Sequence, residues 1–459
     1  MLIGENLPFI KDYIVAINEA IKQQQPEKHL TRLQCGWLSF VILALLVTNS
    51  LCWKRYERFS INKYTAAGLS WMFRKSKILW ETLLQFSVLH ILSVYKINSG
   101  VLVIDDTDKE RSKNTTQIAK AHKIKDKKRG GYFNGQNIVF LVIVSKELTL
   151  PVGFHFYEPD PKMVAWRKEE KRLKEKNVEK RYRPPLPASN PDYPNKKEIA
   201  LKLLKNFIGC FENFKVKSVL ADAFYGTESF ISEAANITKQ KQVISQIKKT
   251  QLINVNGRNV KVHDFFNNYQ GKTENQELRN KNKKITYRSG KFKVKSHNKK
   301  YYIIALKYEN ESEYRYLIAN DMSWRDIDII KAYALRWLVE VFIQDWKLYE
   351  GWNQLAKQRG IEGSDRGVTL SLLCDHALSL HHDQTDLFKN NDPACTVGSL
   401  REKVMMESLS AFIGNIVSSD NPKEMFDQYC SGLSDLFKLQ TSIKHMRHID
   451  FESLQSMEH

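Results

Sequence analysis

The stretch VLVIDDT, from Val101 to Thr107, is a short apolar run that ends in two adjacent carboxylates. It follows a long segment with helical periodicity and few breakers, so it predicts the first buried strand of a sheet. A second run, VKSVLADAFYG from Val216 to Gly226, predicts a strand that also ends in a carboxylate, Asp222. A helix-period segment precedes this run and a short strand follows it, an order that indicates a mixed α/β sheet.

Periodicity and composition divide the chain around this sheet. Residues 1–98 predict a helical N-terminal domain, and its scattered basic side chains suit docking on DNA. Residues 99–247 predict the first part of the core, which is interrupted by a proline-rich, charged excursion at 159–195. Eight of the 12 prolines fall between positions 151 and 194, and this density separates the excursion from the sheet.

The second half of the chain changes period twice. Between 248 and 322 the apolar period becomes two, which predicts an antiparallel β insertion with a basic polar face. Residues 323–380 return to helix period and complete the core. Residues 381–459 predict a helical C-terminal region that could serve dimerisation, although plain helical packing is the simpler interpretation.

Net charge points to the class of partner. The 459 residues include 71 Lys and Arg against 51 Asp and Glu, a formal net charge of +20. This excess predicts a polyanionic partner, either nucleic acid or an acidic membrane surface; the less favoured alternative is a highly soluble surface. The positive charge is concentrated between Lys109 and Arg129, a segment that contains nine basic and two acidic residues. The candidate DNA contacts in this run are Lys120, Lys123, Lys125, Lys127, Lys128 and Arg129.

One apolar segment raises the question of a membrane. Residues Trp37 to Cys52 are almost wholly apolar, but a spanning helix needs about 20 such residues. A buried helix is therefore favoured over a membrane-associated protein, and no membrane partner is expected. The six cysteines form no C-x-x-C pair, so they predict reduced thiols in a cytoplasmic protein. The pair His381–His382 lacks a partner cluster in the sequence, which favours a structural or surface role over metal ligation.

Carboxylates in three contexts are candidates for chemistry. Asp105 and Asp106 end one predicted strand, Asp222 ends another, and Glu340 lies on a later helix. If they converged, such hard oxygen ligands would call for Mg²⁺ or Mn²⁺. Two ions about 4 Å apart can activate water and stabilise the leaving oxygen of a phosphodiester. By spacing alone, solvated surface acids remain the simpler interpretation.

The helix predicted from Lys331 to Tyr349 adds a second pattern. Tyr333, Arg336, Glu340 and Lys347 fall within an arc of roughly 60° at about 100° per residue. The opposite side is apolar. An ordinary solvated face with an i,i+4 Arg–Glu pair would give the same pattern.

These motifs resemble a known family. The spacing Y-x2-R-x3-E-x6-K, complete at Tyr333, Arg336, Glu340 and Lys347, is similar to the signature of the IS4-type bacterial insertion-sequence transposases, which are DDE enzymes. VIDDT resembles the first acidic motif of that family, and LADAFYG resembles the second. The resemblance covers roughly residues 99–380 with the motifs in the family's order.

The resemblance implies a fold and a site. The fold is an RNase H-like mixed-sheet catalytic core, interrupted by the β insertion, with helical N- and C-terminal regions. Asp222 and Glu340 are implied metal ligands with either Asp105 or Asp106, and the pattern leans slightly to Asp106. They would hold two Mg²⁺ or Mn²⁺ ions per active site. Tyr333, Arg336 and Lys347 are implied to bind terminal DNA phosphates.

The resemblance also implies an activity and partners. The expected activity is cut-and-paste transposition, in which metal-dependent phosphodiester hydrolysis and strand transfer pass through a DNA hairpin. The partners are double-stranded terminal inverted repeats and target DNA, bound by a homodimer in a bacterial, nucleoid-associated setting. The alternative is a catalytically inactive DNA-binding protein derived from a transposase.

Overall fold

The computed structural model describes residues 6–60, 63–112, 118–126, 129–269, 273–278, 283–309, 311–352, 360–390 and 392–436. Its centre is a 12-stranded mixed sheet with the order β2-β3-β1-β5-β6-β12-β11-β10-β7-β8, in which β4 also pairs with β3 and β9 with β10. The strands are β1 (Ser99–Arg111), β2 (His122–Lys125), β3 (Tyr132–Val144), β4 (Thr149–Tyr157), β5 (Lys215–Ala221), β6 (Gln242–Ile247), β7 (Leu252–Val255), β8 (Arg258–Lys261), β9 (Glu274–Leu278), β10 (Lys283–Val294), β11 (Lys299–Tyr308) and β12 (Arg315–Ala319).

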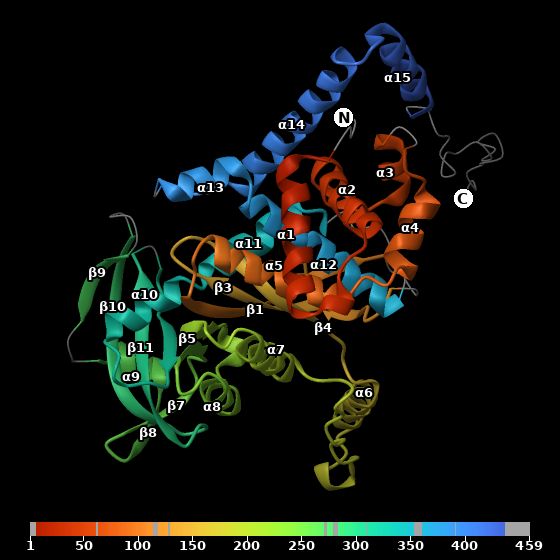
Figure 1. The fold of residues 1–459 in the computed structure, drawn as a ribbon. Helices are drawn as coiled ribbons and strands as arrows, with labels where there is room; N and C mark the ends of the chain where they lie inside the picture. Colours follow the sequence, from red (N-terminus) through yellow and green to blue (C-terminus); the bar gives the residue numbers. More distant parts are fainter. Residues whose placement is uncertain are drawn as a thin grey trace, which may run out of the picture.

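Helices cover both faces of the sheet and extend beyond it (Figure 1). They are α1 (Pro8–Gln24), α2 (Arg32–Thr48), α3 (Trp53–Phe59), α4 (Ala66–Lys75), α5 (Trp80–Val94), α6 (Pro161–Glu175), α7 (Lys196–Cys210), α8 (Glu228–Ile237), α9 (Val262–Asn267), α10 (Asp326–Ala334), α11 (Trp337–Tyr349), α12 (Gly360–Ser379), α13 (His382–Lys389), α14 (Val397–Val417) and α15 (Pro422–Leu436). This mixed α/β architecture is consistent with a DDE or RNase H-like core.

Strand β1 is central because it pairs on both edges. It runs antiparallel to β3 and parallel to β5, and β5 runs parallel to β6. The register between β1 and β5 ends at the pair Ile104–Ala221. Each of these two strands therefore places a carboxylate, Asp105 or Asp222, directly after the last pair of the β1–β5 ladder, and the two acids lie near each other where this ladder ends.

The two faces of β1 bury different side chains. Val101 and Val103 contribute to a core that includes α11 and α12, whereas Leu102 and Ile104 contribute to a core that includes α7 and α8. Since side chains alternate along a strand, Asp105 continues the first face and Asp106 the second. The pleat thus separates the two adjacent acids.

Strands β7 to β12 follow β6 in the chain and extend its sheet. Strand β12 pairs antiparallel with β6, and β11 and β10 follow in antiparallel register. Together with α9 and α10 they form the green to teal lobe in Figure 1.

Helix α2 contains the apolar segment of the sequence and is the most buried helix near the N-terminus. A capping box formed by Thr31 and Gln34 starts it, and Asn49 ends it in the left-handed conformation with φ of 50°. All residues from Trp37 to Thr48 are buried, which confirms the predicted buried helix. Among the described residues, no single helix is long and apolar enough to cross a membrane, although the bent pairs α2–α3 and α4–α5 pass that test by length and composition.

Helix α12 is the partner of the N-terminal helices. It contacts α1, α2, α4 and α5, and residues of α1, α2, α12 and the sheet belong to one hydrophobic core. The boundary expected at residue 98 therefore does not separate two hydrophobic cores. The DNA-binding role expected of residues 1–98 stays a prediction.

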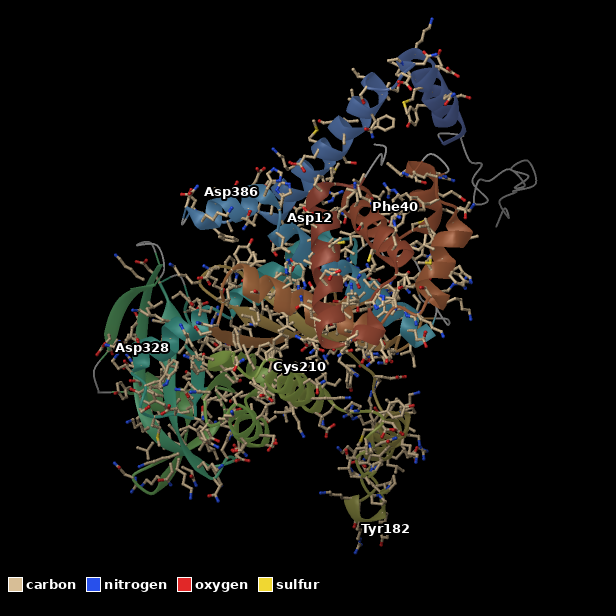
Figure 2. The ribbon with its side chains drawn as sticks, in the orientation of Figure 1. Asp12, Phe40, Tyr182, Cys210, Asp328 and Asp386 are labelled. Atoms are coloured by element: carbon tan, nitrogen blue, oxygen red, sulfur yellow. The ribbon has the colours of Figure 1, made fainter. Side chains whose placement is uncertain are left out.

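The excursion at 159–195 leaves the body as α6 and an extended return (Figure 1). Every residue of α6 is described, and none is buried. Tyr182 lies near the far end of the excursion, away from the sheet (Figure 2), and is 68% exposed. The excursion therefore contributes no buried side chain from α6 to the hydrophobic core.

The prediction of one continuous helix from Lys331 to Tyr349 is wrong, because the helix is interrupted. The structure has two helices, α10 and α11, joined at Leu335 and Arg336. Here the amides of Leu335, Arg336, Leu338 and Val339 donate to carbonyls three residues earlier. This tighter, 3₁₀-like winding changes the angular phase between Tyr333 and the residues after it.

Candidate active site

The two strand acids of the site are placed differently by the fold. The prediction that a strand ends at Asp105 and Asp106 is wrong, because β1 continues to Arg111 by pairing with β3. Asp222 follows β5 and caps a short 3₁₀ turn, and its Oδ1 accepts the Phe224 amide at 2.9 Å. The Ser245 hydroxyl of β6 donates to the Asp222 carbonyl at 2.7 Å. Both contacts hold the second acidic motif against the neighbouring strands.

Arg336 connects the first strand to the Glu-bearing helix. Its Nη1 contacts Asp105 Oδ2 at 2.9 Å, and its Nη2 contacts Glu340 Oε1. The side chains of Arg336 and Asp105 are only 16% and 13% exposed, whereas that of Glu340 is 48% exposed. A planar guanidinium can bridge two carboxylates through separate nitrogens held in one rigid fork, a geometry that an ammonium lacks. The structure thus brings together Asp105, Arg336 and Glu340 across 231 residues of sequence.

Asp106 is held by residues that sequence reasoning missed. Lys196 Nζ lies 2.7 Å from Asp106 Oδ2, and Asn137 Nδ2 donates to the same oxygen at 2.9 Å. Lys196 is the first residue of α7, where the capping box of Asn195 and Glu198 fixes it. The capping box is readable in the sequence, but the contact with Asp106 depends on the tertiary fold.

Burial and mutual repulsion disfavour the charged forms of these acids. The pKa of Asp105 is raised to about 7, first by burial and then by the charges of Asp222 and Asp106, against the opposing effect of Arg336. Burial also raises the pKa of Asp222, and the charge of Asp106 adds to this. The Tyr225 hydroxyl beneath them is fully buried, with no hydrogen-bond partner among the described residues. A cation among these groups would relieve their repulsion.

The other signature residues point to different partners. Tyr333 is 8% exposed, and its hydroxyl accepts a hydrogen bond from Gln246 Nε2 of β6 at 2.8 Å. Burial raises its pKa to about 12. Lys347 Nζ donates to the Asp108 carbonyl of β1 at 3.1 Å. The alternative of one ordinary solvated face therefore does not hold for Tyr333, which is buried against β6. Its ring stays beside the site, since the guanidinium carbon of Arg336 lies 5.8 Å from the ring centre.

The basic run lies on an edge of the sheet. Lys123 and Lys125 are exposed on β2, which pairs with the start of β3. Lys123 Nζ lies 4.6 Å from the ring centre of Tyr132, and Lys120 Nζ lies 5.8 Å from that of Phe156. Arg129 is exposed and lies 3.9 Å from Glu110. Lys127 and Lys128 lie outside the described residues.

The donor set of the site fits hard divalent cations. Its oxygens come from Asp105, Asp106, Asp222 and Glu340, and two of these residues have pKa values raised by burial and neighbouring acids. Carboxylate oxygens are the preferred ligands of Mg²⁺ and Mn²⁺. Arg336 and Lys196 supply the positive charge among the described side chains.

Comparison with known proteins agrees with this chemistry. A family model described as "DDE superfamily endonuclease" matches residues 71–259, which include Asp105, Asp106 and Asp222 but not Glu340. No curated protein shows significant similarity to the sequence. The solved "Drosophila P element transposase strand transfer complex" aligns over 91% of this chain and 94% of that chain at 9% identity, with a TM-score of 0.17. Residues 71–259 are therefore similar to the DDE superfamily endonucleases.

Proposed function

We propose that this protein is a cut-and-paste DNA transposase of the IS4 type. It binds double-stranded insertion-sequence ends and target DNA, hydrolyses phosphodiesters and transfers strands through a hairpin intermediate, as a homodimer on DNA. The observation that carries the proposal is the convergence of Asp105, Arg336 and Glu340 beside Asp222 and Asp106. The family match over residues 71–259 supports the same reaction class.

Two Mg²⁺ or Mn²⁺ ions are proposed for the acidic residues of the site. Such ions activate a water nucleophile and stabilise the leaving oxygen of the phosphodiester. Asp106, Asp222 and Glu340 are the proposed ligands. Asp105 is instead proposed to anchor Arg336, because its side chain is only 13% exposed, whereas that of Glu340, which contacts the same guanidinium, is 48% exposed. Lys196 Nζ, which lies 2.7 Å from Asp106 Oδ2, would have to move for that oxygen to bind a cation.

The test uses the DNA that flanks the gene as substrate. Nicking at the inverted repeats is expected with Mg²⁺ or Mn²⁺, and Ca²⁺ is expected to support binding without cleavage because it is larger and less demanding in geometry. Binding without nicking under every divalent ion would instead identify an inactive, transposase-derived DNA-binding protein. Full cleavage in the presence of a chelator would contradict the metal assignment.

Arg336 is proposed to contact the DNA phosphate once cations occupy the acids. Arg336→Ala and Arg336→Lys are both expected to slow hairpin formation and strand transfer more than the first nick, because neither variant has a planar fork. A time course on intact and pre-nicked ends separates these steps. Lys331→Ala, at an exposed position on α10, is the control. Normal reaction of pre-nicked ends with Arg336→Lys would refute the phosphate role.

The exposed basic residues at the sheet edge are proposed to contact DNA phosphates. Replacing Lys123, Lys125 and Arg129 with glutamine should weaken binding with little sequence selectivity. Each lost contact should flatten the slope of log affinity against log salt by about one unit. Gel-shift titrations at several salt concentrations measure the slope. If it is unchanged, this edge is only a solvated surface.

A further inference from the structure

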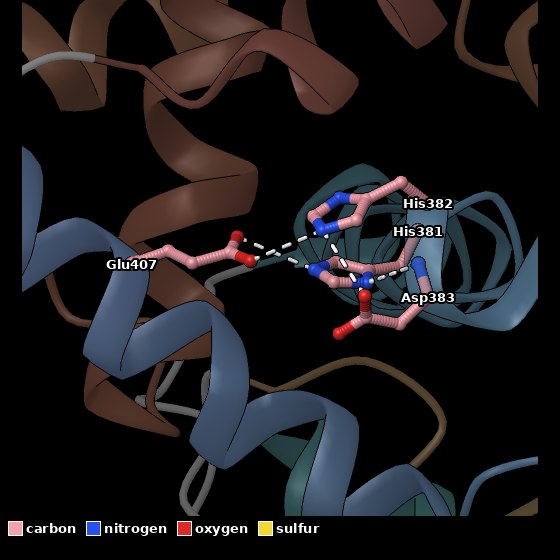
Figure 3. Close-up of side chains that lie close together, drawn as sticks. All are labelled: His381, His382, Asp383 and Glu407. Atoms are coloured by element: carbon pink, nitrogen blue, oxygen red, sulfur yellow. Dashed lines mark hydrogen bonds and ion pairs between the residues drawn. The ribbon is translucent and has the colours of Figure 1, made fainter.

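A cluster of four ligand-type side chains lies far along the chain from the acids of the active site. His381 precedes α13, His382 and Asp383 begin it, and Glu407 reaches the cluster from α14 (Figure 3). One nitrogen or oxygen of each side chain lies within 4.8 Å of those of the others. The sequence favoured a structural or surface role for the His pair because Glu407, the partner supplied by the fold, is 24 residues beyond Asp383.

The spacing of the ligand atoms around His382 suits a small tetrahedral ion. His382 Nε2 lies 3.2 Å from Asp383 Oδ1 and 3.6 Å from Glu407 Oε1. A tetrahedral Zn²⁺ has bonds of about 2.0–2.1 Å to nitrogen and oxygen, which places ligand atoms roughly 3.3–3.4 Å apart. Imidazole nitrogen with carboxylate oxygen is a ligand set that zinc accepts.

The remaining atoms of the two carboxylates are already held. Asp383 Oδ2 lies 3.3 Å from Lys403 Nζ, and Glu407 Oε2 lies 3.3 Å from His381 Nε2. Each carboxylate therefore keeps one oxygen fixed by a neighbour and directs the other towards His382. Such outer contacts orient ligands in known metal sites.

His381 has a different role from His382. Its Nδ1 accepts the Asp383 amide hydrogen at 3.3 Å, so the proton of the neutral ring lies on Nε2 and is donated to Glu407. The ring is fully buried, stacks on His382 at 4.2 Å and packs edge-on against Phe9 at 4.9 Å. His381 is thus a positioning residue for Glu407. Its Nε2 carries a proton and therefore has no lone pair to offer a metal ion.

We propose that His382, Asp383 and Glu407 form a site for a zinc-type divalent ion, separate from the acids at Asp106, Asp222 and Glu340. With a water as the fourth ligand, the ion would join α13 to α14. It would thereby fix the direction in which α14 and α15 leave the body of the molecule (Figure 1).

The test measures zinc on the full-length chain with the Asp222→Asn substitution, which weakens the other carboxylate set. One Zn²⁺ per chain is expected after dialysis, with a rise in melting temperature that Mg²⁺ does not produce. Glu407→Gln and His382→Ala should lose this zinc. His381→Gln should retain it with an affinity lowered by about 10- to 100-fold, as for an outer-shell partner. His29→Ala, at an exposed histidine, is the matched control.

Co²⁺ provides a measurement that does not depend on the folding of the variants. The Asp222→Asn chain should give the intense visible absorption of tetrahedral Co²⁺, and Zn²⁺ should remove it stoichiometrically. Zinc retention in Glu407→Gln equal to that in His29→Ala, or only the weak spectrum of octahedral Co²⁺, would overturn the proposal. Neither result would bear on nicking at the acidic site, which the metal dependence of cleavage tests separately.

Discussion

Glu340→Gln is expected to reduce strand cleavage by at least about 100-fold, the order of loss when a transition-state charge stabiliser is removed. The substitution keeps the shape of the side chain and removes the charge that pairs with Arg336 and would ligate a cation. DNA-end binding should survive, because the substitution removes no Lys or Arg side chain. Nicking rates and gel-shift affinity on the same DNA ends measure both properties, and Glu233→Gln on an exposed position of α8 is the matched control.

The adjacent acids should respond differently to the same change. Asp106→Asn and Asp222→Asn should match Glu340→Gln, whereas Asp105→Asn should retain more cleavage because it loses only the anchor of Arg336. If Asp106→Asn instead retained more cleavage than Asp105→Asn, Asp105 would be the ligand and Asp106 the anchoring residue. Equal, mild effects of both substitutions would remove both residues from the metal site.

Stability is expected to fall as the pH rises through the titration of a buried acid pair. Glu350, at the end of α11, is fully buried, and Asp375 of α12 lies against it. Burial raises the pKa of Glu350, and the charges of Asp375 and Asp345 raise it further. The pKa of Asp375 is raised to about 7, again chiefly by burial.

The sign of the effect follows from proton counts. An unfolded Asp or Glu titrates near pH 4, so between about pH 4 and about pH 7 the folded chain holds protons that the unfolded chain has lost. Each such proton lowers the free energy of unfolding by about 1.4 kcal/mol per pH unit of increase. Below that window the pair has no effect on stability, and above it the penalty from Asp375 is complete.

Neutral replacements isolate the pair from other titrating groups. Glu350→Gln and Asp375→Asn should flatten the pH dependence relative to the unmodified chain and raise stability most at about pH 8. Urea unfolding across this range measures the difference, with the exposed Glu402→Gln as the control. A parallel dependence in variant and unmodified chain would show that the pair is already ionised in the folded state.

Asp105 and Asp222 could be located from the sequence because their signal is local, although β1 continues beyond Asp105 to Arg111. Two apolar runs, one that stops at Asp105 and one that stops at Asp222, mark the strands. Parallel pairing of these strands then places the two acids near each other. The sequence also indicated the apolar side of the Glu340 helix, since Val339, Phe342, Ile343 and Trp346 are buried. These features depend on periodicity alone.

The remaining features of the site depend on contacts between distant parts of the chain. Lys196 meets Asp106 across 90 residues, and Gln246 meets Tyr333 across 87. The 3₁₀-like junction at Arg336 is also set by packing, because the helical pattern runs through it without a Gly or Pro. No pattern within a window of one or two helical turns encodes such pairs.

The packing of α2 on α12 has a consequence during synthesis. About 310 residues separate Thr48 from Gly360, and a ribosome adds about 5–20 residues per second. The apolar surface of α2 is therefore made roughly 15 to 60 seconds before the helix that covers it. Throughout that interval the side of α2 that packs on α12 stays uncovered, although α1, α3 and α4 already contact other parts of the helix.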